Sequence, residues 1–337
     1  MSLYSCNKEE DIEVNKGQVS INKIYGDGNS YCAFTSLIKR NGTYYCAFRE
    51  GKAHVSDDGV IRIMKSTNGK DWMLLTTISK ELIDLRDPNL SIMPDGKLLL
   101  VCGGYRSVGN SEYFIRTFSA KEIYNETFSD IEDINITKLN TNYQHISWVW
   151  KVTWLQDTGY GIIYGNQDET ESFRVSLVKT TDGKNFVIIK DFDIKSQPSE
   201  GRIRFTEDHT MIVLLRRGPL EKGMLGISKP PYIDWQWKEL GVYLAGQDFI
   251  IDDNRIVCVT RSSQDTFEKT VIYWGDLYGN FQWSYMLPTS GLGGDTAYGG
   301  VIAEDNEYMI SYYSMHETSK PSIYICKIPK LVFPKYN

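Results

Sequence analysis

Residues 198–217 read PSEGRIRFTEDHTMIVLLRR and contain two apolar-rich runs on either side of a short polar segment. The runs span residues 202–205 and 211–215, and the residues between them are Thr-Glu-Asp-His-Thr. Two strand-forming runs joined by a polar turn predict a β-hairpin. Because a hairpin returns the chain to its starting side, we expect Glu200 and Arg216 to lie near each other at its open end.

Six segments along the chain share this pattern of an apolar strand, a polar turn and a second apolar strand. Their turns are rich in Asp, Asn and Gly, which suit tight hairpins. The pattern recurs about every 45 to 60 residues, which is close to the size of one blade of a β-propeller. The six segments are residues 34–48, 90–102, 152–164, 203–215, 249–260 and 301–313.

The repeat predicts an all-β fold, a six-bladed β-propeller with about four strands per blade that spans residues 20–337. Residues 1–19 precede it as an N-terminal tail. No amphipathic helical pattern of useful length interrupts the series. Residues 105–145 are expected to form a longer polar connection between the second and third blades.

The composition suits a β-rich protein with a polar binding surface. The chain has 337 residues, 41% of them hydrophobic, and its 22 Tyr, 8 Trp and 13 Phe bring the aromatic share to 13%. Such residues favour strands, and they also line carbohydrate-binding surfaces. A formal net charge of −6 argues against nucleic acid as a partner, because phosphate binding needs a basic face. The same charge neither supports nor excludes a small anionic ligand held by local arginines.

Five of the six cysteines lie in apolar strand-like runs without the spacing of metal ligands, and we expect buried thiols there. Cys6 differs, because Leu3-Tyr4-Ser5-Cys6 is similar to the end of a bacterial lipoprotein signal. This resemblance implies an exported protein in the bacterial periplasm or at the cell surface, tethered to a membrane through a lipidated Cys6. Alternatively, Met-Ser-Leu is an expression leader and Cys6 is incidental. No apolar run is long enough to span a bilayer.

A second motif follows two of the predicted strands: STNGKDW at residues 66–72 and TTDGKNF at residues 180–186. Asn-Gly or Asp-Gly closes a tight turn, and the aromatic residue can pack back beneath it. Weaker echoes lie at residues 228–237 and 274–283. These motifs resemble the Asp-box of the sialidase (neuraminidase) superfamily, whose glycoside hydrolases are built as six-bladed propellers. In that family the boxes are structural turns on the face away from the active site.

The open ends of the six hairpins are expected on one face, and they are rich in arginine, acidic and aromatic residues. Converging residues of these types describe a pocket for a polar, anionic, ring-shaped ligand. Alternatively, several arginines pair with carboxylates of neighbouring blades, most readily Arg202, Arg204 and Arg217. The candidate substrate-binding residues are Arg49, His54, Arg86, Asp87, Trp148, Trp150, Arg216, Gln247, Asp248, Arg261, Asp295 and His316.

The resemblance to sialidases implies catalytic roles for residues of this face. Tyr298, in Gly-Asp-Thr-Ala-Tyr-Gly-Gly, stands where those enzymes have their nucleophilic tyrosine, and Glu200 stands where they have the glutamate that assists it. Arg216 stands where they have one of the arginines that bind the substrate carboxylate. Asp57 or Asp58, ahead of the strand that leads to the first Asp-box, stands roughly where their acid/base aspartate is found.

The chemistry of sialic acid accounts for a tyrosine nucleophile. This sugar carries a carboxylate on the carbon under attack, which would repel a carboxylate nucleophile at close range in a partly dry site. A phenol, with an ordinary pKa of about 10, needs a base to take its proton, and Glu200 is the candidate. The resemblance therefore implies a retaining exo-glycosidase that hydrolyses terminal sialic acid or a similar acidic sugar from glycans.

The resemblance is partial at the arginines. Where sialidases have Arg-Ile-Pro at the start of the first hairpin, this chain has Phe34-Thr35-Ser36, so one arginine of the usual triad is missing. Arg49 or Arg86 could replace it. Arg261 and Lys269 are the nearest matches to the third arginine.

Two alternatives to a sialidase therefore stay open. One is a propeller glycosidase that acts on a different sugar, such as a uronic acid or a deoxy-sugar. The other is a glycan-binding propeller without catalysis. The four histidines are too scattered to predict a metal site, no cofactor is expected, and the oligomeric state stays open.

Overall fold

The computed structural model describes residues 19–108, 112–137, 143–168, 170–262, 268–288 and 294–333. Regular structure in these ranges consists of β-strands and short 3₁₀ turns such as η2 (Lys330–Val332), and none of their helical segments is long and apolar enough to cross a membrane. Cys6 lies outside the described residues. The other five cysteines are free and buried, which confirms the prediction of buried thiols.

Among the described residues, four sheets have four antiparallel strands each. The first contains β2 (Tyr31–Arg40), β3 (Thr43–Gly51), β4 (Val60–Ser66) and β5 (Met73–Ile78). The second contains β17 (Gly201–Phe205), β18 (Met211–Leu215), β19 (Met224–Ser228) and β20 (Gln236–Glu239). The third contains β21 (Asp248–Asp252), β22 (Arg255–Ser262), β23 (Lys269–Asp276) and β24 (Phe281–Met286). The fourth contains β25 (Ala297–Ala303), β26 (Glu307–Ser314), β27 (Ser322–Pro329) and β1 (Ser20–Tyr25).

A further sheet has eleven strands in the part of the chain that the structure describes. Its first part contains β6 (Asp84–Ile92), β7 (Leu98–Val108), β8 (Glu112–Tyr124), β9 (Thr127–Phe128) and β10 (Glu132–Asp133). Its second part contains β11 (Asn135–Thr137), β12 (Ile146–Val149), β13 (Thr153–Leu155), β14 (Thr158–Asn166), β15 (Arg174–Thr180) and β16 (Asn185–Phe192). The two parts join where β12 runs parallel to β8.

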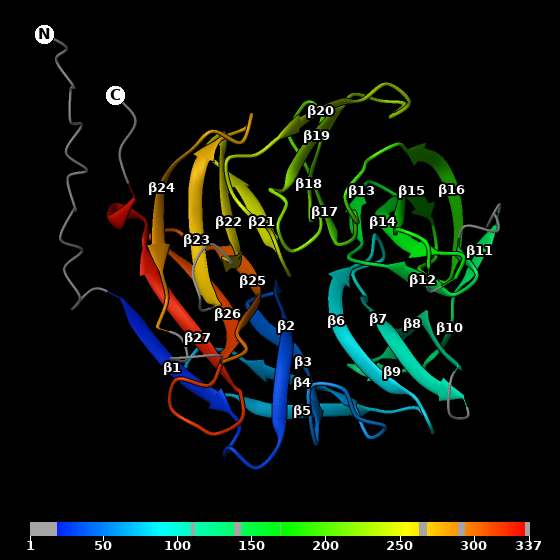
Figure 1. Ribbon diagram of the computed structural model, residues 1–337. Helices are drawn as coiled ribbons and strands as arrows, with labels where there is room; N and C mark the ends of the chain where they lie inside the picture. The colour runs from blue at the N-terminus through cyan, green and yellow to red at the C-terminus, as the bar shows by residue number, and fades with distance from the viewer. Residues whose placement is uncertain are drawn as a thin grey trace, which may run out of the picture.

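The inner strands of these sheets form a closed ring of neighbours. β2 contacts β6 and β25, β13 contacts β6 and β17, and β21 contacts β17 and β25. Figure 1 shows the sheets arranged about a common centre. The N-terminal strand β1 pairs with β27, from Ser20 opposite Lys327 to Tyr25 opposite Ile323, and so completes the last sheet. The protein is therefore an all-β propeller.

All six hairpins predicted from the repeat are present, as β2–β3, β6–β7, β13–β14, β17–β18, β21–β22 and β25–β26. The expectation of a polar connection over residues 105–145 is wrong, because β8 takes its residues from this segment and pairs with β7. Within β8 the buried residues Phe118 and Ala120 stand at a spacing of two. Thr117 and Ser119 are buried too, so both faces of this part of β8 are covered, and its polar residues concealed the strand in the sequence.

The two Asp-box motifs form the same turn. The hydroxyl oxygen that opens each motif, on Ser66 or Thr180, accepts a hydrogen bond of 2.9 Å from the N–H of the motif's glycine. These glycines have φ angles of 66° and 73°, in the left-handed region that glycine adopts without strain. The aromatic residue that ends each motif, Trp72 or Phe186, packs against the hydrophobic core, as predicted.

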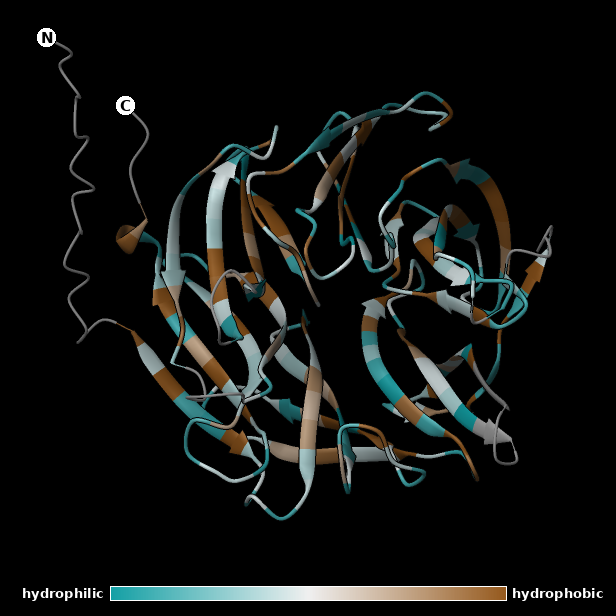
Figure 2. Cartoon of the chain, viewed as in Figure 1, coloured by the Kyte–Doolittle hydropathy of each residue, from teal (hydrophilic) through white to brown (hydrophobic). Residues whose placement is uncertain are grey.

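The hydrophobic core lies between neighbouring sheets. Figure 2 shows apolar residues in bands along the strands. One cluster includes Ile63 of β4 and Leu100 of β7, and another includes Ile212 of β18 and Val271 of β23. Because each of these clusters joins strands of successive sheets, the packing holds the open ends of the hairpins in fixed positions around the ring.

Three inner strands, β25, β2 and β6, carry the same β-bulge near the open ends of their hairpins. At each bulge two residues oppose one residue of the partner strand, which turns a side chain away from the regular alternation. The first residue of each bulge has a positive φ angle, 61° at Phe34, 50° at Asp87 and 44° at Tyr298, which is a costly conformation for a residue with a side chain. The bulges therefore place these three residues at equivalent points of neighbouring strands.

Candidate active site

Glu200, Arg216 and Tyr298 meet at the open ends of the hairpins. Glu200 directly precedes β17 and Arg216 directly follows β18, and their predicted proximity is confirmed, because Arg216 Nη1 donates to Glu200 Oε1 over 2.7 Å. Tyr298, which lies 98 residues further along the chain, donates from its hydroxyl to the same oxygen over 2.7 Å. Arg216 Nη1 also lies 3.1 Å from the Tyr298 hydroxyl oxygen. An acid, a phenol and a guanidinium thus share one hydrogen-bonded cluster.

The segment that precedes β21 holds Glu200 in place. The Gly246 N–H donates to Glu200 Oε2 over 2.5 Å, and the Gln247 side-chain amide donates to the backbone oxygens of Glu200 and Leu214 over 2.6 and 3.0 Å. A Cβ atom at Gly246 would lie 2.3 Å from the ring of Tyr298, so only glycine fits there. The carboxylate is consequently fixed with one oxygen on the backbone and the other on Tyr298.

The electrostatics of the cluster keep the phenol protonated. Burial raises the pKa of Tyr298 above its ordinary value, the negative charge of Glu200 raises it further, and the charges of Arg216 and Arg261 oppose this rise. The charge of Glu200 in turn raises the pKa of Arg216. At neutral pH the cluster therefore holds a neutral Tyr298 beside an acceptor that can take its proton when the phenol oxygen forms a new bond.

Aromatic rings surround Tyr298. The ring centroid of Phe34 lies 5.1 Å from that of Tyr298 at an interplanar angle of 66°, and the Trp150 centroid lies 5.9 Å away at 70°. Trp148 stacks instead on Tyr164, with centroids 5.6 Å apart. Both tryptophans are buried, so of this predicted pair Trp150 contacts the catalytic candidate and Trp148 packs beside it.

Arg261 belongs to a second charged network that flanks Tyr298. Its guanidinium lies 5.0 Å from the centroid of the Tyr298 ring. It donates to Asp295 over 2.8 Å, to the Tyr313 hydroxyl over 2.9 Å and to the backbone oxygen of Thr296 over 3.0 Å. Arg261 therefore supplies positive charge near Tyr298 while most of its donors are already engaged.

The carboxylate of Asp295 is hydrogen-bonded to His54, a predicted site residue, and to two tyrosines. His54 Nδ1 lies 2.7 Å from Asp295 Oδ2, the Tyr31 hydroxyl donates to the same oxygen, and the Tyr313 hydroxyl donates to Oδ1 over 2.7 Å. Burial favours the neutral form of Asp295, but the hydrogen bond from His54 and the charge of Arg261 hold its pKa at about 2. Asp295 is thus a permanent negative charge that orients Arg261.

Arg86 and Asp87 stand at the bulge of β6. Arg86 Nη2 donates to the backbone oxygen of His54 over 3.0 Å, and its guanidinium lies 5.0 Å from the centroid of the Phe34 ring. Arg86 Nε lies 3.8 Å from Asp87 Oδ2, and the Asp87 side chain is 8% exposed. Burial raises the pKa of Asp87 to about 7; the charge of Arg86 lowers it and that of Glu200 raises it further.

Arg49, which was predicted to bind substrate, has its guanidinium engaged within the protein. It is fully buried, and it donates to Asp84 over 2.6 Å, to the backbone oxygen of Ala53 over 2.8 Å and to the Ser56 hydroxyl over 2.8 Å. These contacts engage all three nitrogens of the guanidinium. Arg49 therefore holds the loop after β3 in place through its hydrogen bonds to Ala53 and Ser56.

Asp248 belongs to a buried ionic cluster in the centre of the ring. It accepts hydrogen bonds from Arg202 over 2.6 Å and from Arg204 over 2.9 Å, and Lys151 Nζ lies 3.6 Å away. Arg202, Arg204 and Asp248 line a cavity of about 320 Å³. The alternative that several arginines pair with carboxylates of neighbouring blades is thereby confirmed for Arg202 and Arg204. It is wrong for Arg217, whose partner Glu239 lies in β20 of the same sheet.

Asp57, Asp58 and His316 lie in loops that follow hairpins. Asp57 is exposed, and Asp58 accepts a hydrogen bond of 3.1 Å from the Lys52 N–H. Burial favours the neutral form of Asp58, but hydrogen bonds from Ser56 and Lys52 hold its pKa below the ordinary value. His316 Nδ1 lies 3.0 Å from the Ser314 hydroxyl oxygen, and its ring lies against Tyr324.

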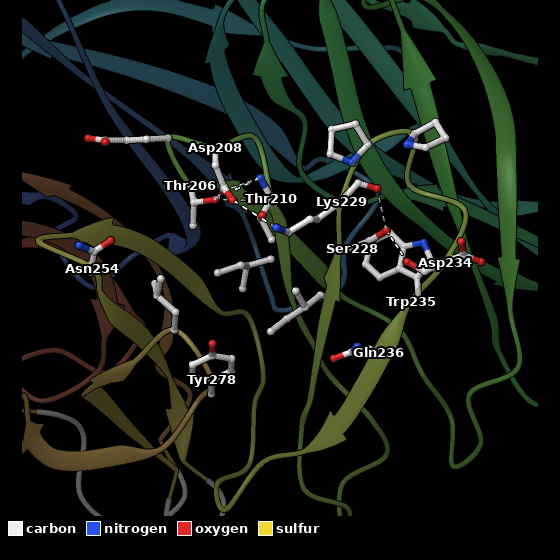
Figure 3. A pocket seen from close by; sticks show the side chains of 16 residues that line it. Thr206, Asp208, Thr210, Ser228, Lys229, Asp234, Trp235, Gln236, Asn254 and Tyr278 are labelled. Atoms are coloured by element: carbon white, nitrogen blue, oxygen red, sulfur yellow. Dashed lines mark hydrogen bonds and ion pairs between the residues drawn. The ribbon is translucent and has the colours of Figure 1, made fainter.

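A cavity of about 780 Å³ lies at the opposite, closed ends of the hairpins. Figure 3 shows Thr206 and Asp208 of the β17–β18 turn at this cavity, together with Trp235 and Tyr278. It contains none of the predicted site residues. Asp208 accepts a hydrogen bond from the Thr206 hydroxyl, so part of its polar lining is already paired. We therefore place the candidate active site at Glu200 and Tyr298, where ionisable groups converge.

Three residues of the site were not singled out from the sequence: Tyr31, Gly246 and Tyr313. The two tyrosines lie in strands β2 and β26, where an aromatic residue is expected for packing alone. Gly246, just before the predicted residue Gln247, was the one available hint, because glycine before a strand often marks a close approach of the backbone.

No family model and no curated protein matches this chain. Its structure is similar to solved structures, among them a protein of unknown function from Dyadobacter fermentans, with a TM-score of 0.79 and 14% identity over 92% of this chain and 98% of that one. An endosialidase of phage phi92 gives a TM-score of 0.71 and 10% identity over 95% of this chain and 70% of that one. An α-L-arabinofuranosidase of Fusarium graminearum gives a TM-score of 0.67 and 13% identity over 92% of this chain and 97% of that one. At these identities the likeness establishes a shared propeller fold.

Proposed function

We propose that this protein is a retaining glycoside hydrolase in which Tyr298 attacks the anomeric carbon of a terminal sugar and Glu200 takes the phenol proton. The observation that carries the proposal is the hydrogen bond of 2.7 Å from the Tyr298 hydroxyl to Glu200, with Arg216 bound to both groups. A weak oxygen nucleophile needs a base within hydrogen-bond reach. The propeller fold shared with an endosialidase and an arabinofuranosidase supports the reaction class.

The reaction has two displacements. In the first, the Tyr298 oxygen bonds to the anomeric carbon, its proton passes to Glu200, and the glycosidic bond breaks as an acid protonates the leaving oxygen. In the second, water attacks the same carbon, the bond to Tyr298 breaks, and the phenol recovers its proton from Glu200. Two inversions at one carbon retain its configuration.

We propose further that the ring has six blades, with the open ends of the six hairpins on one face. Among the described residues, the eleven-stranded sheet is continuous through one pair, Ile146 of β12 with Ile115 of β8. Its two parts share a core cluster that includes Leu99 of β7 and Phe186 of β16. Packing of this kind is expected between adjacent blades rather than within one sheet. Division at β8 and β12 would give two blades beside the four separate sheets, each beginning with a predicted hairpin.

Sialic acid, or a similar acidic sugar, is the first candidate substrate. Its carboxylate lies on the carbon under attack, where a neutral phenol avoids the repulsion that a carboxylate nucleophile would meet. Arg216 and Arg261 flank Tyr298 with positive charge. A Tyr–Glu pair in place of two carboxyl groups is consistent with this chemistry.

A sugar without a carboxylate on the reacting carbon is the second candidate, such as a uronic acid, a deoxy-sugar or an arabinofuranose. Phe34 favours it, because its ring contacts Tyr298 where the resemblance leads us to expect an arginine. Arg261 favours it too, because Asp295 and Glu268, at 2.8 and 3.1 Å, already engage its guanidinium. A substrate carboxylate would have to displace one of these partners.

The test is release of methylumbelliferone from glycosides of sialic acid, glucuronic acid, fucose, rhamnose and arabinofuranose. We expect the parent chain to hydrolyse one class, with retention of configuration by NMR, and Tyr298→Phe to lower the rate by about 10³-fold or more. Tyr278→Phe is the matched control, because Tyr278 is an exposed tyrosine at the distant cavity.

The outcomes separate the alternatives. Turnover of a neutral or uronic sugar without turnover of the sialoside would select the second candidate. Absence of hydrolysis of every glycoside would overturn the proposal. Glycan affinity that survives the loss of both Glu200 and Tyr298, without hydrolysis by the parent chain, would identify a binding propeller instead.

A further inference from the structure

Asp87 occupies the same structural position as Tyr298, in another strand of the ring. The bulge of β6 falls between Arg86 and Asn89, and that of β25 falls between Ala297 and Gly300, so Asp87 and Tyr298 are each the first residue of their bulge. Between these two strands stands β2, whose bulge begins at Phe34. The same strained bulge thus occurs in three successive strands, and its first residue is Phe34, Asp87 or Tyr298.

The Asp87 carboxyl group is buried and only partly satisfied. Its Oδ1 has no hydrogen-bond partner among the described residues, and its Oδ2 lies 3.8 Å from Arg86 Nε. Four ionisable groups act electrostatically on the pKa of Asp87, and they come from different parts of the chain: Arg86, Glu200, His54 and Lys151. A buried carboxyl oxygen without a partner costs free energy, so such an arrangement is expected where the group has another task.

Asp87 also lies within electrostatic reach of the proposed nucleophile. Burial raises the pKa of Tyr298, and the charges of Glu200 and Asp87 both raise it further. Burial raises the pKa of Tyr164, which stacks on Trp148, and the charges of Glu200 and Asp87 raise it further. The charge of Asp87 therefore acts on the same groups as the charge of Glu200.

We propose that Asp87, rather than Asp57 or Asp58, is the general acid and base of the hydrolysis, an inference that rests on the function proposed above. In the first displacement the Asp87 carboxylic acid gives its proton to the glycosidic oxygen as the bond to the anomeric carbon breaks, and the alcohol leaves neutral. In the second, the Asp87 carboxylate takes a proton from the attacking water, and Asp87 returns to its acid form.

The protonation state of Asp87 suits this role. A general acid is most effective when its pKa lies near the working pH, and burial raises the pKa of Asp87 to about 7. Asp58 has a pKa below its ordinary value and accepts a backbone hydrogen bond, and Asp57 is exposed. Neither of these has the buried carboxyl group that Asp87 offers.

The first test compares leaving groups. With the sugar that the parent chain hydrolyses, we expect Asp87→Ala to lower kcat/KM for a methoxyphenyl glycoside by about 10²- to 10⁴-fold, and for a dinitrophenyl glycoside by much less, because dinitrophenolate leaves without a proton. Azide should restore turnover of the dinitrophenyl glycoside and form a glycosyl azide. Asp95→Asn is the matched control, because Asp95 lies exposed at the other end of the same hairpin.

The second test measures the proton on Asp87 without any substrate. The infrared difference spectrum between the parent chain and Asp87→Asn should contain a carboxylic acid band at pH 5 that disappears as the pH rises through about 7. A carboxylate band throughout this range would overturn the assignment. The assignment would also be overturned if Asp57→Asn or Asp58→Asn, and not Asp87→Ala, lowered kcat/KM more for the methoxyphenyl glycoside than for the dinitrophenyl glycoside.

The two tests separate this assignment from the proposed function. If the parent chain hydrolyses a glycoside and Asp87→Ala is as active as Asp95→Asn, the proposed role of Asp87 is wrong, whereas the proposed hydrolase function is retained. If the parent chain hydrolyses no glycoside, both fall, because there is then no reaction for Asp87 to assist.

Discussion

Glu200 and Asp248 are two buried carboxylates near the centre of the ring, and their partners differ. Asp248 faces three cationic side chains, Arg202, Arg204 and Lys151, within 3.6 Å. Glu200 faces one guanidinium, one phenol and one backbone N–H. Both clusters include residues in or next to β17. Glu200 directly precedes this strand, and Arg202 and Arg204 lie in it at the two-residue spacing that places side chains on one face.

The difference in partners separates a structural ion cluster from a reactive one. Burial opposes the charge of Asp248, but Arg202, Lys151 and Arg204 hold its pKa well below the ordinary value, so it stays ionised and exchanges no proton. Glu200 shares its oxygen with the Tyr298 hydroxyl, whose proton can move when the phenol oxygen reacts. A carboxylate beside a phenol can thus act in chemistry, whereas one beside three cations holds strands together.

The largest effect expected from this comparison is on activity. Glu200→Gln removes the base and leaves Tyr298 protonated, so kcat should fall by about 10³- to 10⁵-fold on the hydrolysed glycoside. Glutamine keeps a hydrogen-bond acceptor for Tyr298, and we expect the thermal midpoint to change little. A loss of activity below about tenfold, with the fold intact, would contradict the role of Glu200.

The next effect is on stability. Asp248→Ala leaves Arg202, Arg204 and Lys151 buried without their common partner, and it should lower the free energy of unfolding by about 3–5 kcal/mol. The measurement is equilibrium unfolding in urea. A change below about 1 kcal/mol, which is typical of exposed ion pairs, would show that this cluster does not stabilise the ring.

Asp87 should give stability the opposite dependence on pH from that of Asp248. The folded chain keeps the Asp87 proton up to about pH 7, whereas the unfolded chain loses it near pH 4, so stability falls as the pH rises between these values. The pKa of Asp248 is lowered by folding, so its contribution is present above about pH 4 and is lost as the pH falls further.

Asp87→Asn removes the first of these dependences. We therefore expect it to stabilise the chain at pH 8 relative to the parent, by at most about 4 kcal/mol, and to have a smaller effect at pH 5. Thermal unfolding at the two pH values measures this. An equal effect at both would show that Asp87 ionises in the folded chain at its ordinary pKa.

The smallest effect concerns Gln247, which stands between the two clusters. Gln247→Met removes the amide that holds the backbone oxygens of Glu200 and Leu214, at a cost of about 1–3 kcal/mol in unfolding free energy. Because Gln247 positions Glu200 without touching its carboxylate, kcat should fall about tenfold with KM little changed. Rescue of kcat by Gln247→Asn would show that the amide rather than the packing volume matters.

Several features of the site were predictable because they depend on local pattern. The Glu200–Arg216 contact follows from the hairpin between β17 and β18, which the two apolar runs and the polar turn of residues 198–217 predict. The contact of Glu200 with Tyr298 was expected only through the resemblance to sialidases, since nothing near either residue points to the other. The long strand β8 was missed because its polar residues concealed the apolar spacing.

The fate of the arginines could not be predicted. Arg49 and Arg261 look alike in the sequence, since each lies near the end of the second strand of a hairpin. Nevertheless Arg49 is buried against Asp84, whereas Arg261 lies beside Tyr298. The difference depends on which carboxylate of a neighbouring strand comes within 3 Å. Such partners are distant in the chain, so spacing along the sequence carries no information about them.

Polar turns and the apolar runs on either side of them were sufficient to define the hairpins, their number and their open ends, because these properties depend on neighbours along the backbone. The charge state of each carboxyl group depended on closure of the ring. Desolvation and ion pairing act through space, so only the packed chain distinguishes Asp87, which keeps its proton to about pH 7, from Asp248, which loses it well below its usual range.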